Sequence, residues 1–363
     1  MRKAAIIFLF MALLPLHGCK KEDAINPRHT GELYLDHSTD IAVALQGIQN
    51  ADNSLWQRAG WWNSANIMEA MIDYSKNSGA DLSGMCRQIY SANQYFEGGD
   101  FKNRTYDDCG WWALAWIKAY DQYGDARYLQ TAEDIFAYMV AGGWDNKCNG
   151  GMAWQNIDRY KNAITNELFI LLAARLASRQ STIWQRAYYL DWALKGWNWL
   201  SQSGMMNGDY LFNDGLDKNC NNNGANAWTY NQGVILAGLK DIYLLTSNPQ
   251  YLQSARQMAM ASMVKLSDAD SILTEPCPRQ NFVPDAGQFK GPYIKFLSEL
   301  NTVLKDTVIK QYIVHNAAVA WSNAQNNQHL FDGYWQGPYE NWQGSTTGVA
   351  LDLMNAATVE MRQ

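Results

Sequence analysis

The regular succession of helical segments is the feature that most constrains the fold of this 363-residue chain. Apolar residues recur at the helical period in about twelve stretches, with helix stop signals between them. No stretch shows the two-residue alternation of a half-buried strand, so the sequence predicts an all-α fold of helical hairpins. We expect helices at residues 38–56, 61–77, 81–95, 107–123, 125–142, 159–179, 181–203, 227–246, 248–266, 285–304, 307–326 and 343–361.

Even-numbered and odd-numbered segments begin differently. The odd-numbered ones have the pattern of ordinary amphipathic helices. The even-numbered ones open with polar, aromatic or small residues: "GWWNSAN", "YDDCGWW", "YKNAITN", "WTYNQG", "DAGQFKG" and "GSTTG". This alternation suits an (α/α)6 barrel, a six-hairpin toroid whose inner helices run the same way and bring these openings to one cavity. The alternative is that the openings are only helix caps, because Asn, Asp and Gly begin helices in many proteins.

The composition of these openings favours a carbohydrate ligand. The chain contains 16 Trp and 20 Tyr. Flat rings stack on the apolar C–H faces of sugars, while Asn, Gln and Asp hydrogen-bond to sugar hydroxyls. Because both kinds of side chain gather in the same openings, we expect the cavity to bind a glycan.

Two adjacent carboxylates, Asp107 and Asp108, stand at the start of the fourth segment. Trp111, Trp112 and Trp116 follow them, so the acids open a helix whose first turns are aromatic. When two carboxylates lie beside buried apolar side chains, their pKa values can differ enough for one to act as an acid and the other as a base. The pair is therefore the candidate catalytic group, with helix capping as the alternative.

Four motifs resemble those of one enzyme family and occur in its order between about Trp56 and the C-terminus. They are "GWWNSANIMEAMIDY", "YDDCGWWALAWIKAYD", "YKNAITNELFILLAARL" and "TYNQGVILAGLKDIY". The chain resembles glycoside hydrolase family 76, the endo-α-1,6-mannanases, which are (α/α)6 barrels in bacteria. The resemblance implies cleavage of α-1,6-mannan or manno-oligosaccharides with retention of anomeric configuration, and no cofactor.

The same resemblance implies roles for the two acids, with Asp107 as nucleophile and Asp108 as general acid/base. A retaining glycosidase needs two carboxylates about 5–5.5 Å apart, which adjacent residues at a helix start can supply. The family's "GGIWW" stands here as "GGMAW" at residues 150–154. Only Trp154 of that tryptophan pair remains, so we expect the stacking wall to differ in shape.

Further sugar contacts are predicted at motif positions expected to face the cavity. These are Asn66, Trp154, Asn162, Asn166, Tyr230, Asn231 and Gln232. Each of them has capping or core packing as its alternative role. Asp214, in the Asx-rich loop at 212–226, is a further candidate for a hydrogen bond to a sugar. The alternative is that this loop is an ordinary Asx-rich turn. The loop has no EF-hand pattern, and we expect no metal.

Two other functions remain open at this stage. The same barrel could transfer the cleaved sugar to another sugar instead of to water. A non-catalytic glycan-binding lipoprotein is the alternative from another class, and such a protein would not need the Asp107-Asp108 pair. No G-x-S-x-G, P-loop or H-E-x-x-H motif is present in the sequence.

The N-terminus predicts export. Residues 1–18 have a basic start and a short apolar run, which is typical of a signal peptide. The "LHGC" that ends this run resembles the lipobox of bacterial lipoproteins, with Cys19 as the lipidated residue. We therefore expect a tether at 19–35 and a catalytic domain at 36–363. We also expect an exported outer-membrane lipoprotein that reaches the membrane through its lipid alone, on either the periplasmic or the cell-surface face.

Charge and cysteine content limit the partners. The formal charge is −6, and loss of Arg2 and Lys3 with the signal peptide makes it −8, so we expect no nucleic-acid partner. We expect a monomer. Five cysteines remain besides Cys19, without a C-x-x-C pair. Export would permit a disulfide such as Cys148–Cys220, although the sequence does not fix the connectivity.

Overall fold

The computed structural model describes residues 27–277, 279 and 285–363; the predicted signal peptide and Cys19 lie outside this part of the chain. Within it, a short 3-10 helix, η1 (Lys147–Asn149), accompanies twelve α-helices. These are α1 (Pro27–Gly47), α2 (Trp61–Ser78), α3 (Ser83–Asn93), α4 (Tyr106–Tyr123), α5 (Ala126–Gly143), α6 (Ala163–Ala177), α7 (Ile183–Gln202), α8 (Thr229–Thr246), α9 (Pro249–Lys265), α10 (Ala286–Leu304), α11 (Thr307–Asn323) and α12 (Gly344–Arg362).

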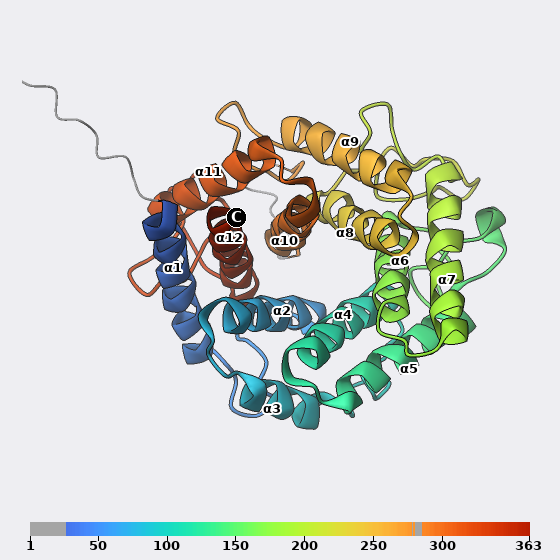
Figure 1. The fold of residues 1–363 in the computed structure, drawn as a ribbon, viewed down its shortest axis with the longest axis horizontal. Helices are drawn as coiled ribbons and strands as arrows, with labels where there is room; N and C mark the ends of the chain where they lie inside the picture. Colours follow the sequence, from blue (N-terminus) through green and yellow to red (C-terminus); the bar gives the residue numbers. More distant parts are fainter. Residues whose placement is uncertain (1–26, 278, 280–284) are drawn as a thin grey trace, which may run out of the picture.

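The helices form the predicted (α/α)6 barrel. Figure 1 shows α2, α4, α6, α8, α10 and α12 as an inner ring, with α1, α3, α5, α7, α9 and α11 outside it. The first helix packs against the last, so α1 and α12 close the ring. No helix of the described residues is both long enough and apolar enough to span a membrane.

Inner and outer helices differ in burial as their sequences predict. Every residue of α6, from Ala163 to Ala177, is buried, because an inner helix meets protein on all sides. Outer helix α5 buries one stripe, which includes Tyr128, Ile135 and Met139, and exposes its opposite face. The burial of α6 on all sides therefore marks it as an inner helix.

The helix starts separate the two rings in a second way. Four outer helices begin with a side-chain cap that accepts a backbone N–H of the first turn; the capping residues are Asp125, Thr182, Asn248 and Asp306. None of the six inner helices has a side-chain cap of this kind. In α2 and α12 the side chains of Asn63 and Thr346 instead accept the N–H of the residue before the helix, so capping explains these two polar residues and leaves the other openings unexplained.

Four short hairpins repeat at the end of the barrel where the inner helices begin. Each follows an outer helix and is closed by a single bridge; the bridges are Trp144–Met152, Met206–Phe212, Ser267–Leu273 and Gln325–Phe331. In each hairpin a side chain accepts the backbone N–H of the closing residue; the acceptors are Asn166, Gln232, Asn316 and Thr347. These bonds fix the loops on the barrel, and the sequence did not predict them.

The predicted boundaries of two helices, the first and the sixth, were wrong. The first helix spans 27–47 rather than 38–56, so it takes in part of the predicted tether. Proline suits the first turn of a helix, and residues 50–56 form a turn that ends in the bridge between Gln49 and Trp56. The sixth helix begins at Ala163 rather than 159, because Asn162 is extended and pairs with Gly215.

Candidate active site

A cavity of about 430 Å³ lies where the inner helices begin. Six of its lining residues were predicted from the sequence: Asp107, Asp108, Trp154, Asn162, Asp214 and Tyr230. The sequence reasoning did not single out six others as site residues: Trp62, Thr105, Trp111, Tyr160, Asp285 and Phe289. Five of these six, all except Thr105, belong to the stretches that open the even-numbered helical segments. Their position at the start of an inner helix could therefore have identified them.

Asp107 lies in the first turn of α4, and each of its carboxylate oxygens accepts an N–H. The backbone N–H of Asp108 donates to Oδ1 at 3.0 Å, and the indole Nε1–H of Trp154 donates to Oδ2 at 3.2 Å. Burial, followed by the charge of Asp108, raises the pKa of Asp107 well above its ordinary value. The two N–H donors favour the ionised form of this carboxyl.

Only one carboxylate oxygen of Asp108, Oδ2, accepts a hydrogen bond from the described residues. The side-chain amide of Asn103 donates to Oδ2 at 2.8 Å. Burial raises the pKa of Asp108 to about 6, and the negative charges of Asp285 and Glu97 act in the same direction against the Asn103 hydrogen bond. Because both carboxyls have raised pKa values, the pair retains a proton closer to neutral pH than two free aspartates would.

The loop that carries Trp154 is held by backbone pairing. The N–H of Tyr106 donates to the carbonyl of Trp154 at 2.9 Å, and the N–H of Trp154 donates to the carbonyl of Tyr160 at 2.8 Å. Gly151 allows the loop to pass close to Trp199: its φ is +81°, and a Cβ there would lie 2.5 Å from the indole. This path brings the Trp154 indole to Asp107.

Four aromatic rings, one from each of four inner helices, line one side of the cavity. The ring of Trp62 lies 5.8 Å from Trp111 and 6.0 Å from Phe289, and Phe289 stacks on Tyr230 at 3.9 Å. The planes in each of these contacts differ by 20° to 29°. Such an arc of nearly parallel rings offers apolar faces to a sugar.

The cavity contains four carboxylates and no cationic side chain among its lining residues. Asp214 accepts a hydrogen bond from the Tyr160 hydroxyl at 2.6 Å, and burial raises its pKa. Asp285 accepts a hydrogen bond from Trp62, and burial raises its pKa as well. Asn162 directs a side-chain oxygen without a protein partner toward this region. The site therefore presents hydrogen-bond acceptors to a hydroxyl-rich ligand.

The prediction of direct sugar contact was wrong for four residues, because they lie beneath the cavity rather than in its wall. Their exposed fractions are 2% or less, and they are Asn66, Asn166, Asn231 and Gln232. The Asn166 amide bonds to both N–H and carbonyl of Met152, and the Gln232 amide does the same with Phe212. Those two amides therefore hold loops. The Asn66 amide bonds to the Trp62 carbonyl and accepts from Lys295, and the buried Asn231 amide has no hydrogen bond to the described residues.

A disulfide joins two of the loops next to the cavity. Cys148 and Cys220 are bonded, with their Cα atoms 5.3 Å apart, across 72 residues of sequence. Cys86 and Cys109 are buried as free thiols. Among the described residues, no group of three or more His, Cys, Asp or Glu side chains is placed to hold a metal ion.

Comparison with known proteins places the chain in a family. The sequence model of glycosyl hydrolase family 76 matches residues 42–363. The chain belongs to glycosyl hydrolase family 76. Among curated relatives it is 26% identical over 312 residues to a mannan endo-1,6-alpha-mannosidase of Saccharomyces cerevisiae, DCW1, covering 77% of this chain and 68% of that protein. It is 28% identical over 247 residues to another mannan endo-1,6-alpha-mannosidase, DFG5 of Candida albicans. That match covers 61% of this chain and 53% of DFG5.

Solved family 76 structures share the fold. The GH76A alpha-1,6-mannanase from Salegentibacter sp. HEL1_6 is 20% identical, with a TM-score of 0.80 over 90% of this chain and 99% of that one. An inactive variant of that mannanase, with two consecutive aspartates changed to alanine, was solved with alpha-1,6-mannotetrose; it is 19% identical, with a TM-score of 0.78 over the same shares. The predicted family and fold are confirmed.

Proposed function

We propose that this family 76 protein is a retaining endo-α-1,6-mannanase that uses Asp107 and Asp108. One observation carries the proposal: two adjacent carboxyls share a cavity without a cation, and their hydrogen bonds differ. The names of the fungal and bacterial relatives support the substrate. The Salegentibacter variant supports the residues, since replacing two consecutive aspartates there gave an inactive protein that holds a manno-oligosaccharide.

In the first step, Asp107 attacks C1 of the mannose as its glycosidic bond breaks. Burial and the charge of Asp108 raise the pKa of Asp107, and the N–H bonds to both of its oxygens act against this effect and favour the ionised form needed for attack. Asp108 gives its proton to the departing oxygen. Its Oδ1, which accepts no hydrogen bond from the described residues, is suited to carry that proton. The products are a mannosyl ester on Asp107, a shortened chain, and an ionised Asp108.

In the second step, water attacks C1 and the ester bond to Asp107 breaks. Asp108 now takes the proton from this water, so both carboxyls return to their starting states. Two displacements at one carbon restore the α configuration. The aromatic arc of Trp111, Trp62, Phe289 and Tyr230 would hold neighbouring sugars by their C–H faces.

Digestion of unbranched α-1,6-mannan tests the proposal. We expect internal cleavage, seen by chromatography as a rapid fall in chain length before small products accumulate. An NMR time course should show α-anomeric ends first, with the β form appearing later by mutarotation. First-formed β ends would mean inversion by a water-activating base. Cleavage of another glycan but not of this mannan would mean a different substrate.

We propose further that the protein is exported and anchored by a lipid on Cys19. The motivation is the "LHGC" at the end of the apolar run. The Cys148–Cys220 disulfide supports an oxidising compartment. Palmitate labelling in a lipoprotein-processing bacterium should disappear in the Cys19→Ala variant, because the thioether needs that sulfur. Labelling that persists in this variant would contradict the anchor.

A further inference from the structure

A groove of about 570 Å³ lies on the outer wall of the barrel between α7 and α9. Figure 1 shows both helices in the outer ring, on either side of α8. The α7 wall consists of Leu194, Trp197, Asn198 and Ser201, whose spacing places them on one helical face. The α9 wall comes from its first two turns and consists of Gln250, Tyr251, Gln253 and Ser254.

The groove has no charged side chain among these eight residues, although charged residues make up 18% of the chain. Two of the eight are aromatic, and five others carry an amide or a hydroxyl. Trp197 and Tyr251 are partly buried against the core, which holds each ring while part of its surface stays accessible. Fixed rings can stack on a ligand at low entropic cost.

The polar groups of the groove are available for a ligand. Within the described residues, the side chains of Gln250, Gln253 and Ser254 have no hydrogen bond to protein. Asn198 accepts from Gln202 at 2.8 Å through Oδ1, which leaves its amide N–H groups free. Donors and acceptors of this neutral kind match sugar hydroxyls.

We propose that this groove is a second glycan-binding site, which holds the polymeric substrate without cleaving it. The identity of the polymer as α-1,6-mannan rests on the proposed function. The groove combines aromatic rings with uncharged amides, as a sugar site requires, but it has no carboxylate to act as nucleophile or acid. Binding a long chain at a second site raises its effective concentration at the first.

Affinity electrophoresis tests the groove apart from catalysis. The full chain is used in an Asp107→Asn background, so that mannan in the gel is not digested. We expect Trp197→Ala to weaken retardation by α-1,6-mannan about fivefold to tenfold, because a stacking surface is lost. Trp184→Ala is the matched control, since Trp184 is on the same helix, 85% exposed and outside the groove. It should be retarded like its parent.

A second variant distinguishes loss of binding from misfolding of Trp197→Ala. Gln250→Ala with Gln253→Ala removes two exposed amides from the groove and keeps good helix formers, so the thermal unfolding curve should not change. Retardation should weaken about threefold. In the active enzyme, both groove variants should raise KM for the polymer and leave kcat/KM for a mannotriose-sized substrate unchanged.

Three results would overturn the groove as a glycan site. They are no retardation of the parent protein, equal retardation of the parent and both groove variants, and equal loss in Trp184→Ala. Retardation by dextran as strong as by mannan would support a site for neutral glycans and overturn its assignment to mannan. Cleavage of a short α-1,6-manno-oligosaccharide by the unmodified enzyme tests the proposed function separately from all of these outcomes.

Discussion

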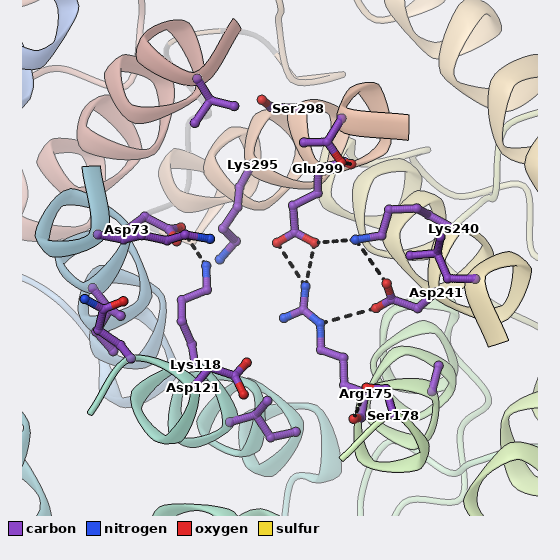
Figure 2. A pocket seen from close by; sticks show the side chains of 18 of the residues that line it. Asp73, Lys118, Asp121, Arg175, Ser178, Lys240, Asp241, Lys295, Ser298 and Glu299 are labelled. Atoms are coloured by element: carbon purple, nitrogen blue, oxygen red, sulfur yellow. Dashed lines mark hydrogen bonds and ion pairs between the residues drawn. The ribbon is translucent and has the colours of Figure 1, made fainter. Parts of the chain in front are cut away.

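The carboxylates at the two ends of the barrel differ in whether a cation lies beside them. Where the inner helices begin, Asp107 and Asp108 have no cationic partner in the cavity, and their pKa values are raised. Where the inner helices end, a second cavity of about 630 Å³ is lined by both acids and bases. Figure 2 shows this second cavity, with Arg175, Lys240, Asp241 and Glu299 joined across three helices.

Glu69 illustrates what the cations at the second cavity do. It is completely buried, yet its Oε2 lies 2.6 Å from Lys295 Nζ and its Oε1 3.6 Å from Lys118 Nζ. Burial would raise the pKa of Glu69, but the positive charges of Lys295, Lys118 and Arg175 lower it below its ordinary value. Cations are also favoured at this end because helix C-termini carry partial negative charge.

Comparing the two ends distinguishes the effect of burying a carboxylate from the effect of pairing it with a cation. Carboxylates at both ends are removed from water, but only those of the second cavity regain the lost hydration energy from a cation. Asp352 is an exception there, since its carboxylate is 2% exposed without a hydrogen-bond partner, and burial raises its pKa to about 7 despite Lys295. Apart from Asp352, these acids of the second cavity are paired with cations, whereas Asp107 and Asp108 are not.

The largest expected effect is on turnover. Asp108→Asn should lower kcat on mannan by about 10²–10⁴-fold, because the leaving oxygen loses its proton donor. Asp107→Asn should lose at least as much, because no ester can form. Reducing-end assays on α-1,6-mannan measure both losses. Wild-type turnover in either variant would return the pair to a capping role.

The next effect is on stability, with opposite signs at the two ends. Glu69→Gln should lower the free energy of unfolding at pH 7 by about 3 kcal/mol, because Lys295 loses its partner in a buried site. The lowered pKa of Glu69 means that its contribution is present above the unfolded value near 4.3 and is lost as pH falls. Urea unfolding at several pH values measures this.

Asp108→Asn should instead raise the free energy of unfolding by about 1–2 kcal/mol at pH 8. Its folded pKa of about 6 lies above the unfolded value, so the carboxyl favours folding only while protonated and this benefit is lost as pH rises through 6. The gain should therefore vanish near pH 4. A loss of stability at pH 8 would contradict the comparison.

A smaller effect is expected at Trp154. Trp154→Phe removes the N–H that Asp107 Oδ2 accepts and keeps an aromatic ring in the wall. We expect kcat/KM to fall about tenfold, since a hydrogen bond to a charged group is lost. The acid limb of the pH profile should move to higher pH, because the ionised form of Asp107 is less stabilised. Trp184→Phe is the control, because Trp184 is exposed and lies outside the cavity.

The smallest predicted effect concerns Asp285. Its negative charge raises the pKa of Asp108, so Asp285→Asn should move the alkaline limb of the kcat/KM profile to lower pH by a few tenths of a unit. Asp270→Asn is a matched control, because Asp270 is an exposed acid outside the cavity. An equal shift in the control would assign the effect to net charge instead of position.

Sequence reasoning reached the fold because helical period and the character of each helix start are local properties. It also placed Asp107, Asp108, Trp154, Asn162, Asp214 and Tyr230 at the cavity. It misplaced Asn166 and Gln232, since a polar residue three positions into an inner helix can face either the cavity or a loop. That choice depends on hairpins formed by distant residues, such as the bridge of Met206 with Phe212.

The roles of the two aspartates provide the most direct test of the account. An activated α-mannoside, whose leaving group needs no proton, is given to each variant with azide present. In Asp108→Asn the first step should survive, and azide should restore turnover and form an α-mannosyl azide. Asp107→Asn should form no covalent mannosyl enzyme by mass spectrometry. A covalent intermediate in Asp107→Asn, or a β-mannosyl azide from Asp108→Asn, would contradict the assignment of Asp107 as nucleophile.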